Sequence, residues 1–105
     1  MGFRYISVSG IEKEKIKVQA RAIYSDLTVT GDFSCSDERL NQLQKNLVWS
    51  GKDNFVDIPT DCPQRDERQG WTGDIALFAG TACFNFQMNR FLGKWLRDMK
   101  AEQEN

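Results

Sequence analysis

Apolar and polar residues alternate along two stretches near the start of the chain. From Phe3 to Ser9 an alternating pattern would place Phe3, Tyr5 and Ser7 on one face and Arg4, Ile6 and Val8 on the other. From Lys15 to Tyr24 apolar residues occupy every second position. A period of two residues predicts strands that bury one face. Gly10 and the charged residues after it are typical of a turn, so the two strands are expected to pair as a hairpin. A short extended piece is also expected at 28–33.

After Ser36 the apolar residues recur at helical spacing. Ser36 is a favourable N-cap residue, two acids follow it where the helix dipole favours negative charge, and Gly51 stands where a helix would stop. These signals predict one helix over 37–50, a second that starts near Asp74, and a third from 88 to about 103. The residues expected to be buried are Ile75, Phe78, Ala79 and Ala82 in the second helix, and Phe91, Leu92, Trp95 and Met99 in the third.

The order of these elements predicts an α+β protein, with short N-terminal strands followed by about three helices. Two or three strands form a thin sheet when they stand alone. The change of pattern therefore suggests the end of one structural unit, residues 1–33, and the start of another, residues 34–105. The apolar faces of the helices are broader than three helices can cover, which makes them a candidate surface for a homo-oligomer.

Composition and charge argue against several classes of function. The 105 residues carry 14 basic and 15 acidic side chains, so the net charge of −1 offers no global field for nucleic acid or an anionic membrane. The sequence contains no run of about 18 apolar residues, the length that could span a bilayer. The N-terminus lacks the apolar region of a signal peptide, which leaves the cytoplasm as the default location.

The sequence contains no histidine, which narrows the chemistry further. Without histidine the chain lacks the Ser-His-Asp and Cys-His mechanisms and the usual zinc sites. The three cysteines, Cys35, Cys62 and Cys83, form no CxxC pair, which argues against a disulfide framework and mildly for a reducing compartment. Any reaction would depend on carboxylates, arginines, thiols or hydroxyls.

The segment from Asp57 to Asp74, DIPTDCPQRDERQGWTGD, concentrates the chemically useful side chains. It holds five acids, two arginines, a tryptophan and both prolines of the chain, and its proline and glycine content argues against a regular helix or a central strand. Two carboxylates that flank a bond are the arrangement for glycoside hydrolysis, and tryptophan offers a flat apolar face to a sugar ring. A solvated network of ion pairs, with Asp74 as a helix N-cap and Trp71 as a core anchor, would have the same composition. Residue types and spacing alone leave both interpretations open.

This segment resembles, almost position for position, the signature loop of the bacterial α-L-rhamnosidases of glycoside hydrolase family 78. The flanks are also similar to that family: GFRYISVSG to a strand that ends the last β-sandwich before the catalytic barrel, GDFSCSDERLNQLQKNLVWSGKDNF to the first barrel helix, and FNFQMNRFLGKWLRDMKAEQEN to the helix after the loop. The similarity covers nearly the whole chain. Within the motif, Gln69 stands where the family usually has a hydrophobic residue, at a position without a chemical role.

The resemblance implies a glycosidase that removes terminal α-L-rhamnose with inversion of configuration in an (α/α)6 barrel. Residues 1–33 would be the last strands of a β-sandwich and a linker, and residues 34–105 the first barrel helices and the catalytic loop. By match to the motif, Glu67 would be the general acid. The residues that would hold the sugar are Asp61, Arg65, Trp71 and Asp74. No metal or other cofactor is implied for this loop.

An inverting glycosidase also needs a second carboxylate as its base, which the family takes from a later part of the barrel. The chain is therefore expected to be a fragment that carries the acid but not the base, and to be inactive or nearly so by itself. The alternative is a non-catalytic module that binds carbohydrate or associates with itself.

Overall fold

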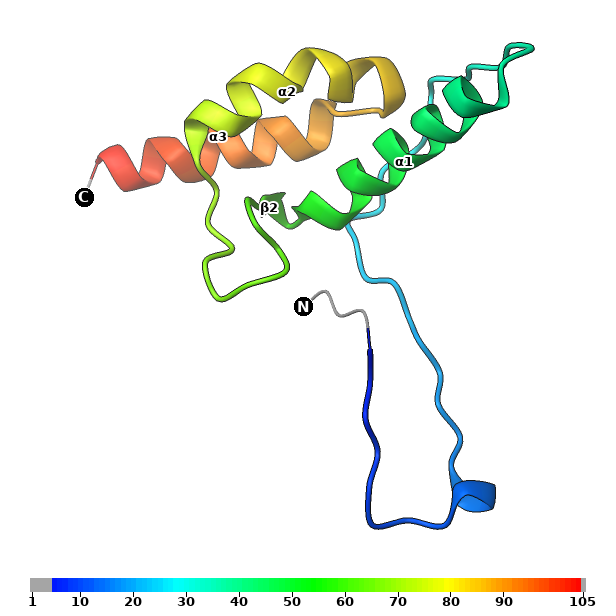
Figure 1. Ribbon diagram of the computed structural model, residues 1–105. Coiled ribbons are helices and arrows are strands. Elements are labelled where there is room, and N and C mark those ends of the chain that lie inside the picture. Colours follow the sequence, from blue (N-terminus) through cyan, green and yellow to red (C-terminus); the bar gives the residue numbers. More distant parts are fainter. Residues whose placement is uncertain (1–4, 105) are drawn as a thin grey trace.

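The computed structural model describes residues 5–104 as a helical body from which an extended N-terminal arm, residues 5–24, projects (Figure 1). The elements in chain order are the 3-10 turn η1 (Lys13–Lys15), helix α1 (Glu38–Asn54), strands β1 (Phe55–Val56) and β2 (Ile58–Pro59), and helices α2 (Thr72–Asn85) and α3 (Asn89–Gln103). No helix in this part of the chain is long and apolar enough to cross a membrane.

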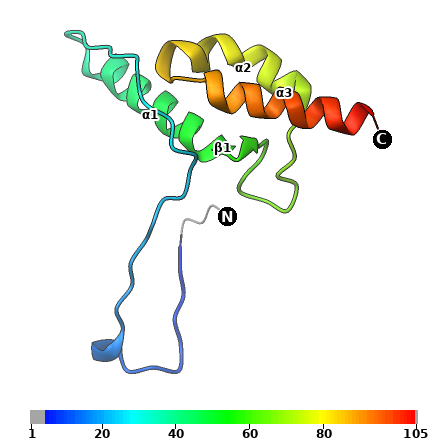
Figure 2. The ribbon, with the colours of Figure 1, turned by 180° about the vertical axis from the view of Figure 1, so that it is seen from behind.

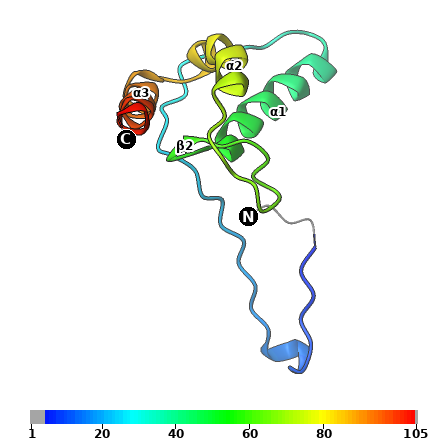
Figure 3. The same ribbon diagram turned by 90° about the vertical axis from the view of Figure 1, so that its left-hand side faces the viewer.

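Helices α2 and α3 lie side by side and antiparallel, and α1 runs beside them at an angle (Figures 1 and 2). The three helices occupy one end of the molecule, and the arm extends toward the other end. The segment between β2 and α2 projects from the helices toward the same side as the arm (Figure 3). This segment, residues 60–71, is called the acidic loop below.

A small aromatic core joins the helices to the short hairpin. Phe55 and Phe86 are almost completely buried and meet edge to face, with ring centroids 6.0 Å apart, and the ring of Phe91 lies 5.1 Å from that of Phe55. Such aromatic pairs add to the stabilisation from buried area alone. The buried core residues are Phe55, Ile75, Ala82, Phe86, Met88 and Phe91, with Leu27, Val48, Phe78, Ala79, Leu92 and Trp95 packed against them. The inner faces expected for the second and third helices are therefore confirmed. The half-buried members of these faces are Phe78, Ala79, Leu92, Trp95 and Met99.

The segment before α1 is bound to the end of α2. Val29 and Phe86 form an isolated antiparallel bridge, and the Thr30 N–H donates to the carbonyl of Asn85 over 2.9 Å. The buried Asn85 side chain in turn accepts a hydrogen bond from the Gln44 amide of α1 over 2.6 Å. The extended piece expected at 28–33 is therefore reduced to one bridge. Together with the contacts of Asn85 it links the segment before α1, the end of α2 and α1 itself.

Two residues that were expected to mark the start and the end of α1 do not do so. The N-cap is Asp37 and not Ser36, because the Asp37 carboxylate accepts a hydrogen bond from the Arg39 N–H over 2.9 Å. Gly51 does not stop the helix, which continues to Asn54. A Cβ atom at Gly51 would lie 2.8 Å from the ring of Phe86, so this glycine allows the helix to approach the core closely.

The N-terminal hairpin expected from the alternating pattern is not formed in the described residues. Phe3 and Arg4 lie outside those residues. From Tyr5 to Tyr24 the chain is extended, and its only backbone hydrogen bonds are the two that close η1. Val18, which was expected to face inward, is 62% exposed. A strand is stable only when it has a hydrogen-bonded partner and a covered face, and here it has neither. The α+β prediction is therefore wrong for this arm, whereas the helical region after Ser36 is confirmed.

Candidate active site

The acidic loop leaves the core from a very short hairpin. β1 and β2 pair antiparallel, with Phe55 opposite Pro59, and both of these residues are buried. Asp57 forms the apex of the hairpin, with a backbone φ of 65° in the left-handed region. The buried hairpin therefore fixes the point from which Asp61 starts the loop.

Contacts between Asp61 and Gln69 close the acidic loop. The Asp61 N–H donates to the Gln69 carbonyl over 2.9 Å, and the Gln69 N–H donates to the Asp61 carboxylate over 2.8 Å. Both contacts use the backbone of Gln69, so they do not require a particular side chain at this position. Inside the closure, Cys62 and Arg68 have positive φ values of 37° and 49°, which turn the chain within a short path.

Glu67 lies between Arg65 and Trp71. One carboxylate oxygen of Glu67 forms an ion pair with the Arg65 guanidinium, and the other accepts a hydrogen bond from the indole N–H of Trp71 over 3.3 Å. The Glu67 side chain is 34% exposed, so a ligand in solvent can reach it. Trp71 is half-exposed and is therefore not a core anchor.

Asp66 points away from this group. Its carboxylate pairs with the Arg68 guanidinium at 3.1 Å, and its side chain is 98% exposed. The adjacent acids Asp66 and Glu67 each have an arginine of their own, which relieves the repulsion expected between two neighbouring carboxylates. The loop therefore does contain a network of ion pairs, but only one of the two pairs contacts the indole.

The thiol of Cys62 lies close to two carboxylates. One donor atom from each of Asp61, Cys62 and Glu67 falls within 4.8 Å of the others, the only such group of metal-ligating side chains in the described part of the chain. Burial raises the pKa of the Cys62 thiol; Arg65 lowers it and the two carboxylates raise it, with a net upward shift. A thiol that keeps its proton at neutral pH is a poor nucleophile and a poor metal ligand. Arg65 already balances the charge of Glu67, which further weakens the group as a cation site.

Asp74 reaches the same region from α2. It stands in the first turn of that helix, and the N-cap position belongs to Trp71, which forms no side-chain capping bond. Asp74 and Asp61 both line a pocket of about 290 Å³ whose walls include the apolar Phe55 and Ile75. Asp61 therefore belongs both to this pocket and to the group around Glu67. Two acceptors at a partly apolar pocket suit a sugar, which has hydroxyls on its rim and C–H faces. Arg65, Glu67 and Trp71 do not line this pocket, and Asp61 connects it to them.

The residues that hold the acidic loop in place could not be identified from the sequence. The Lys94 ammonium of α3 pairs with the Asp57 carboxylate at 2.9 Å, and Gly70 lies against the ring of Trp95. These partners are far apart along the chain, and no local pattern in a single sequence connects them.

Several known proteins that are similar to this chain share one described activity. The sequence model described as the bacterial α-L-rhamnosidase six-hairpin glycosidase domain matches residues 28–105. An α-L-rhamnosidase from Formosa agariphila is 45% identical over 97% of this chain and 11% of its own length. The solved α-L-rhamnosidase from Dictyoglumus thermophilum has a TM-score of 0.70 and 45% identity, covering 73% of this chain and 9% of that one. The solved Streptomyces avermitilis α-L-rhamnosidase complexed with L-rhamnose has a TM-score of 0.72 and 44% identity, covering 74% of this chain and 8% of that one. This chain thus spans about a tenth of the length of these relatives.

Proposed function

Because this chain belongs to the bacterial α-L-rhamnosidase family, we propose that it supplies the acid side of an active site that removes terminal α-L-rhamnose from rhamnosides with inversion. The observation that carries the proposal is the placement of Glu67 between Arg65 and Trp71. Glu67 is assigned as the general acid, which gives its proton to the leaving oxygen as the glycosidic bond breaks.

Arg65 has a part in this proposal both before and after the sugar binds. Its guanidinium pairs with the Glu67 carboxyl group. Arg65 is also the residue assigned to donate to a sugar hydroxyl. Binding of the sugar would draw the guanidinium toward that hydroxyl and leave the Glu67 carboxyl group accessible to the glycosidic oxygen.

The sugar itself would lie over the pocket shared by Asp61 and Asp74. Both carboxylates are assigned to accept hydrogen bonds from rhamnose hydroxyls, and the pocket of about 290 Å³ that they line supports this assignment. Trp71, half-exposed beside Glu67, would form an apolar wall against the C–H side of the ring. Its N–H would meanwhile hold the Glu67 carboxyl group in orientation.

The general base of the reaction is assigned to a residue outside the described part of the chain. Inverting glycosidases keep their two carboxyl groups roughly 6.5–9.5 Å apart, which leaves space for the attacking water. Asp61 has a carboxylate oxygen within 4.8 Å of one on Glu67, which is too close for that purpose. The family takes its base from a later part of the barrel, so we expect the 105-residue chain to show no turnover of a rhamnoside by itself.

The division of the chain into two units is also part of the proposal. Residues 34–105 would form the opening of an (α/α)6 barrel, and residues 1–33 the end of a β-sandwich and a linker. The family match, which begins at residue 28, supports a boundary near this point. The change from an exposed arm to a packed helical body occurs over the same residues.

The acid assignment is tested in a hybrid enzyme, in which residues 28–105 replace the matching segment of the Streptomyces avermitilis relative. Glu67→Gln should lower kcat/KM for methyl α-L-rhamnoside by about 100- to 10,000-fold. The loss should be much smaller for dinitrophenyl α-L-rhamnoside, whose leaving group departs without a proton. Asp66→Asn, the matched control at the exposed neighbouring acid, should change neither value.

Full activity of the Glu67→Gln hybrid on the methyl substrate would show that Glu67 is not the acid. Clear turnover by the 105-residue chain itself, abolished by the same substitution, would show that the base lies within the chain.

A non-catalytic sugar-binding module is the second candidate, favoured by the exposed indole of Trp71. Titration of the chain with rhamnose, followed by tryptophan fluorescence, would show saturable binding, and the unmutated hybrid enzyme would show no turnover.

Self-association through the exposed Leu77 and Phe84 of α2 would appear in size-exclusion chromatography as a concentration-dependent elution volume.

A further inference from the structure

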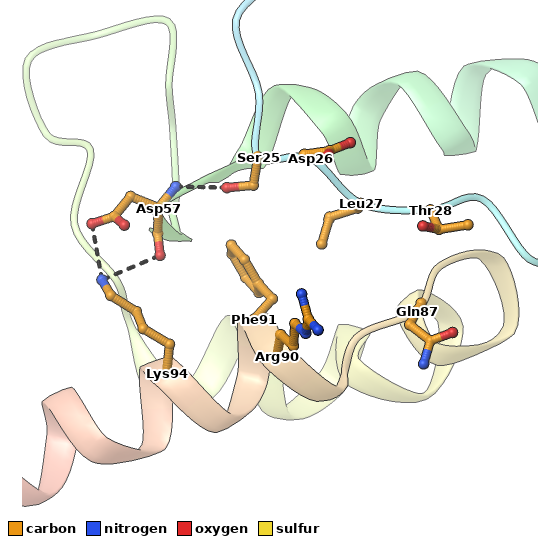
Figure 4. A pocket seen from close by; sticks show the side chains of 9 residues that line it. All are labelled: Ser25, Asp26, Leu27, Thr28, Asp57, Gln87, Arg90, Phe91 and Lys94. Atoms are coloured by element: carbon orange, nitrogen blue, oxygen red, sulfur yellow. Dashed lines mark hydrogen bonds and ion pairs between the residues drawn. The ribbon is translucent and has the colours of Figure 1, made fainter.

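Lys94 of α3 is bound to the entrance of the acidic loop. Its ammonium group donates to the Asp57 carboxylate over 2.9 Å and to the Asp57 carbonyl over 3.4 Å, and it also pairs with Asp98 at 2.8 Å. The hydrogen bonds to Asp98 and Asp57 raise the pKa of Lys94, so it stays charged across the neutral range. Figure 4 shows Lys94 reaching Asp57 at the edge of a pocket of about 510 Å³.

The Asp57 backbone needs such support. A φ of 65° is costly for a residue with a side chain, and it persists where the surroundings hold it. The Asp57 N–H donates to the Ser25 hydroxyl oxygen over 2.9 Å, and the carbonyl and carboxylate are both held by Lys94. Ser25 is anchored in turn, because its N–H donates to the Phe55 carbonyl over 2.8 Å. Every polar group of Asp57 is therefore bound by another part of the molecule (Figure 4).

The next residue of α3 holds the other end of the acidic loop. Gly70 lies so close to Trp95 that a Cβ atom there would be 2.6 Å from the Cη2 atom of the indole ring. Trp95 packs against the aromatic core and cannot easily move away. Consecutive residues of α3, Lys94 and Trp95, thus contact Asp57 before the loop and Gly70 near its end.

We propose that these two contacts, here called the α3 clamp, position the acidic loop so that Glu67 meets the glycosidic oxygen, and that Lys94 and Gly70 are positioning residues for the reaction. This inference rests on the proposed role of Glu67. Glu67 lies between the clamped points along the chain, and its carboxylate is bound by two residues of the same loop, Arg65 and Trp71. A shift of either end of the loop would therefore move Glu67 relative to the walls of the sugar pocket that α1 and α2 provide.

The catalytic test uses the hybrid enzyme and two leaving groups. Lys94→Met should lower kcat/KM for methyl α-L-rhamnoside on the order of 10- to 100-fold, since a displacement of about 1 Å can have such an effect. The loss for dinitrophenyl α-L-rhamnoside should be several-fold smaller, because that substrate depends little on the acid. Lys94→Arg should restore most of the activity. A loss of folded enzyme would instead lower both values equally, and an equal loss would overturn the proposal.

Gly70→Ala should give the same unequal loss, because its methyl group would push the loop away from Trp95. Two matched variants, one in α3 and one in α2, should leave kcat/KM unchanged for both substrates. Lys100→Met removes an exposed lysine of α3 whose partner is Glu104, and Gly80→Ala adds a Cβ atom in α2 with nothing within 4 Å. If these controls lose as much activity as the clamp variants, the effect is not specific to the loop.

A second measurement does not depend on catalysis. Trypsin cleavage of the 105-residue chain after Arg65 and Arg68, followed by mass spectrometry, reports how firmly the loop is held. Lys94→Met and Gly70→Ala should accelerate these two cleavages several-fold, while cleavage after Arg21 in the exposed arm stays constant. Unchanged loop cleavage would overturn the clamp whether or not the hybrid is active. An inactive unmutated hybrid with faster loop cleavage in the variants would overturn only the proposed function.

Discussion

The acidic loop is closed by hydrogen bonds to the backbone, which do not depend on the side chain at Gln69. Asp61 binds the backbone of Gln69 in both directions, so the departure of Gln69 from the usual hydrophobic residue leaves the loop closed. The side chains that must be specific are those around Glu67, where an arginine and an indole each bind one carboxylate oxygen. The residue types of this group could be predicted from the sequence, because the motif names them. The sequence could not predict that Asp66 and Arg68 form a separate ion pair, away from Glu67.

Cys62 provides a test of the electrostatics within the loop. Because the pKa of its thiol is raised, less thiolate is present at a given pH, and alkylation by iodoacetamide should be slow at neutral pH. Its rate should rise only at a pH above that needed for a free thiol. Arg65→Gln removes the positive charge that favours the thiolate, so the profile should move to still higher pH.

The alkylation rate of each cysteine is measured by mass spectrometry of the labelled peptides over a range of pH. Arg68→Gln, which removes an arginine that pairs with Asp66, should leave the Cys62 profile in place. A Cys62 profile that coincides with that of a free thiol would contradict the buried, acid-flanked environment.

At the scale of elements, the contacts between helices decide how individual positions behave. The sequence predicted three helices and the inner faces of α2 and α3, because apolar spacing reflects which side of a helix is covered. In α1 the apolar spacing misleads, since Leu40 and Leu43 are exposed. It assigned the wrong role to Gly51, since a glycine that ends a helix and a glycine that admits an aromatic ring look the same in one sequence. Phe86, which fills the space at Gly51, comes from beyond the end of a different helix.

Two glycine-to-alanine substitutions should therefore have opposite effects on stability. Gly51→Ala places a methyl group 2.8 Å from the Phe86 ring, and overpacking of this kind costs about 1–3 kcal/mol. The gain in helix propensity offsets up to about 1 kcal/mol of that cost. We expect a net loss of about 1–2 kcal/mol in the free energy of unfolding, measured by urea denaturation.

Gly80→Ala is the matched substitution at an exposed helical position, with nothing within 4 Å of the added atom. It should raise the free energy of unfolding by up to about 1 kcal/mol, since only helix propensity changes. Equal effects of the two substitutions would mean that Phe86 does not pack against Gly51.

At the scale of the whole molecule, the helical body and the arm differ in what holds them. The body is joined by the core, by the bridge at Val29 and by the contacts of Asn85. The arm reaches the body through Tyr24, whose ring meets Trp49 edge to face at 6.2 Å and lies 4.9 Å from the Lys52 ammonium. Before Tyr24 the described side chains are almost all exposed.

Deletion of residues 1–22 should consequently leave the helical body intact. The shortened chain keeps Tyr24, and the removed part forms no buried contacts among the described residues. The helical circular dichroism signal per molecule should be nearly unchanged. The thermal midpoint should move by no more than about 4 °C, as expected for changes of about 0.5 kcal/mol. A larger fall in the midpoint would show that the arm stabilises the helices.

The sequence by itself determined which segments form helices, which faces of α2 and α3 are covered, and which residue types the acidic loop contains. These features are encoded locally, in apolar spacing and in a dense motif. The tertiary structure decided that the alternating arm has no strand partner, that Gly51 packs against Phe86, and that α3 holds both ends of the loop through Lys94 and Trp95. Each of these depends on residues brought together from distant parts of the chain, so no local pattern contains them.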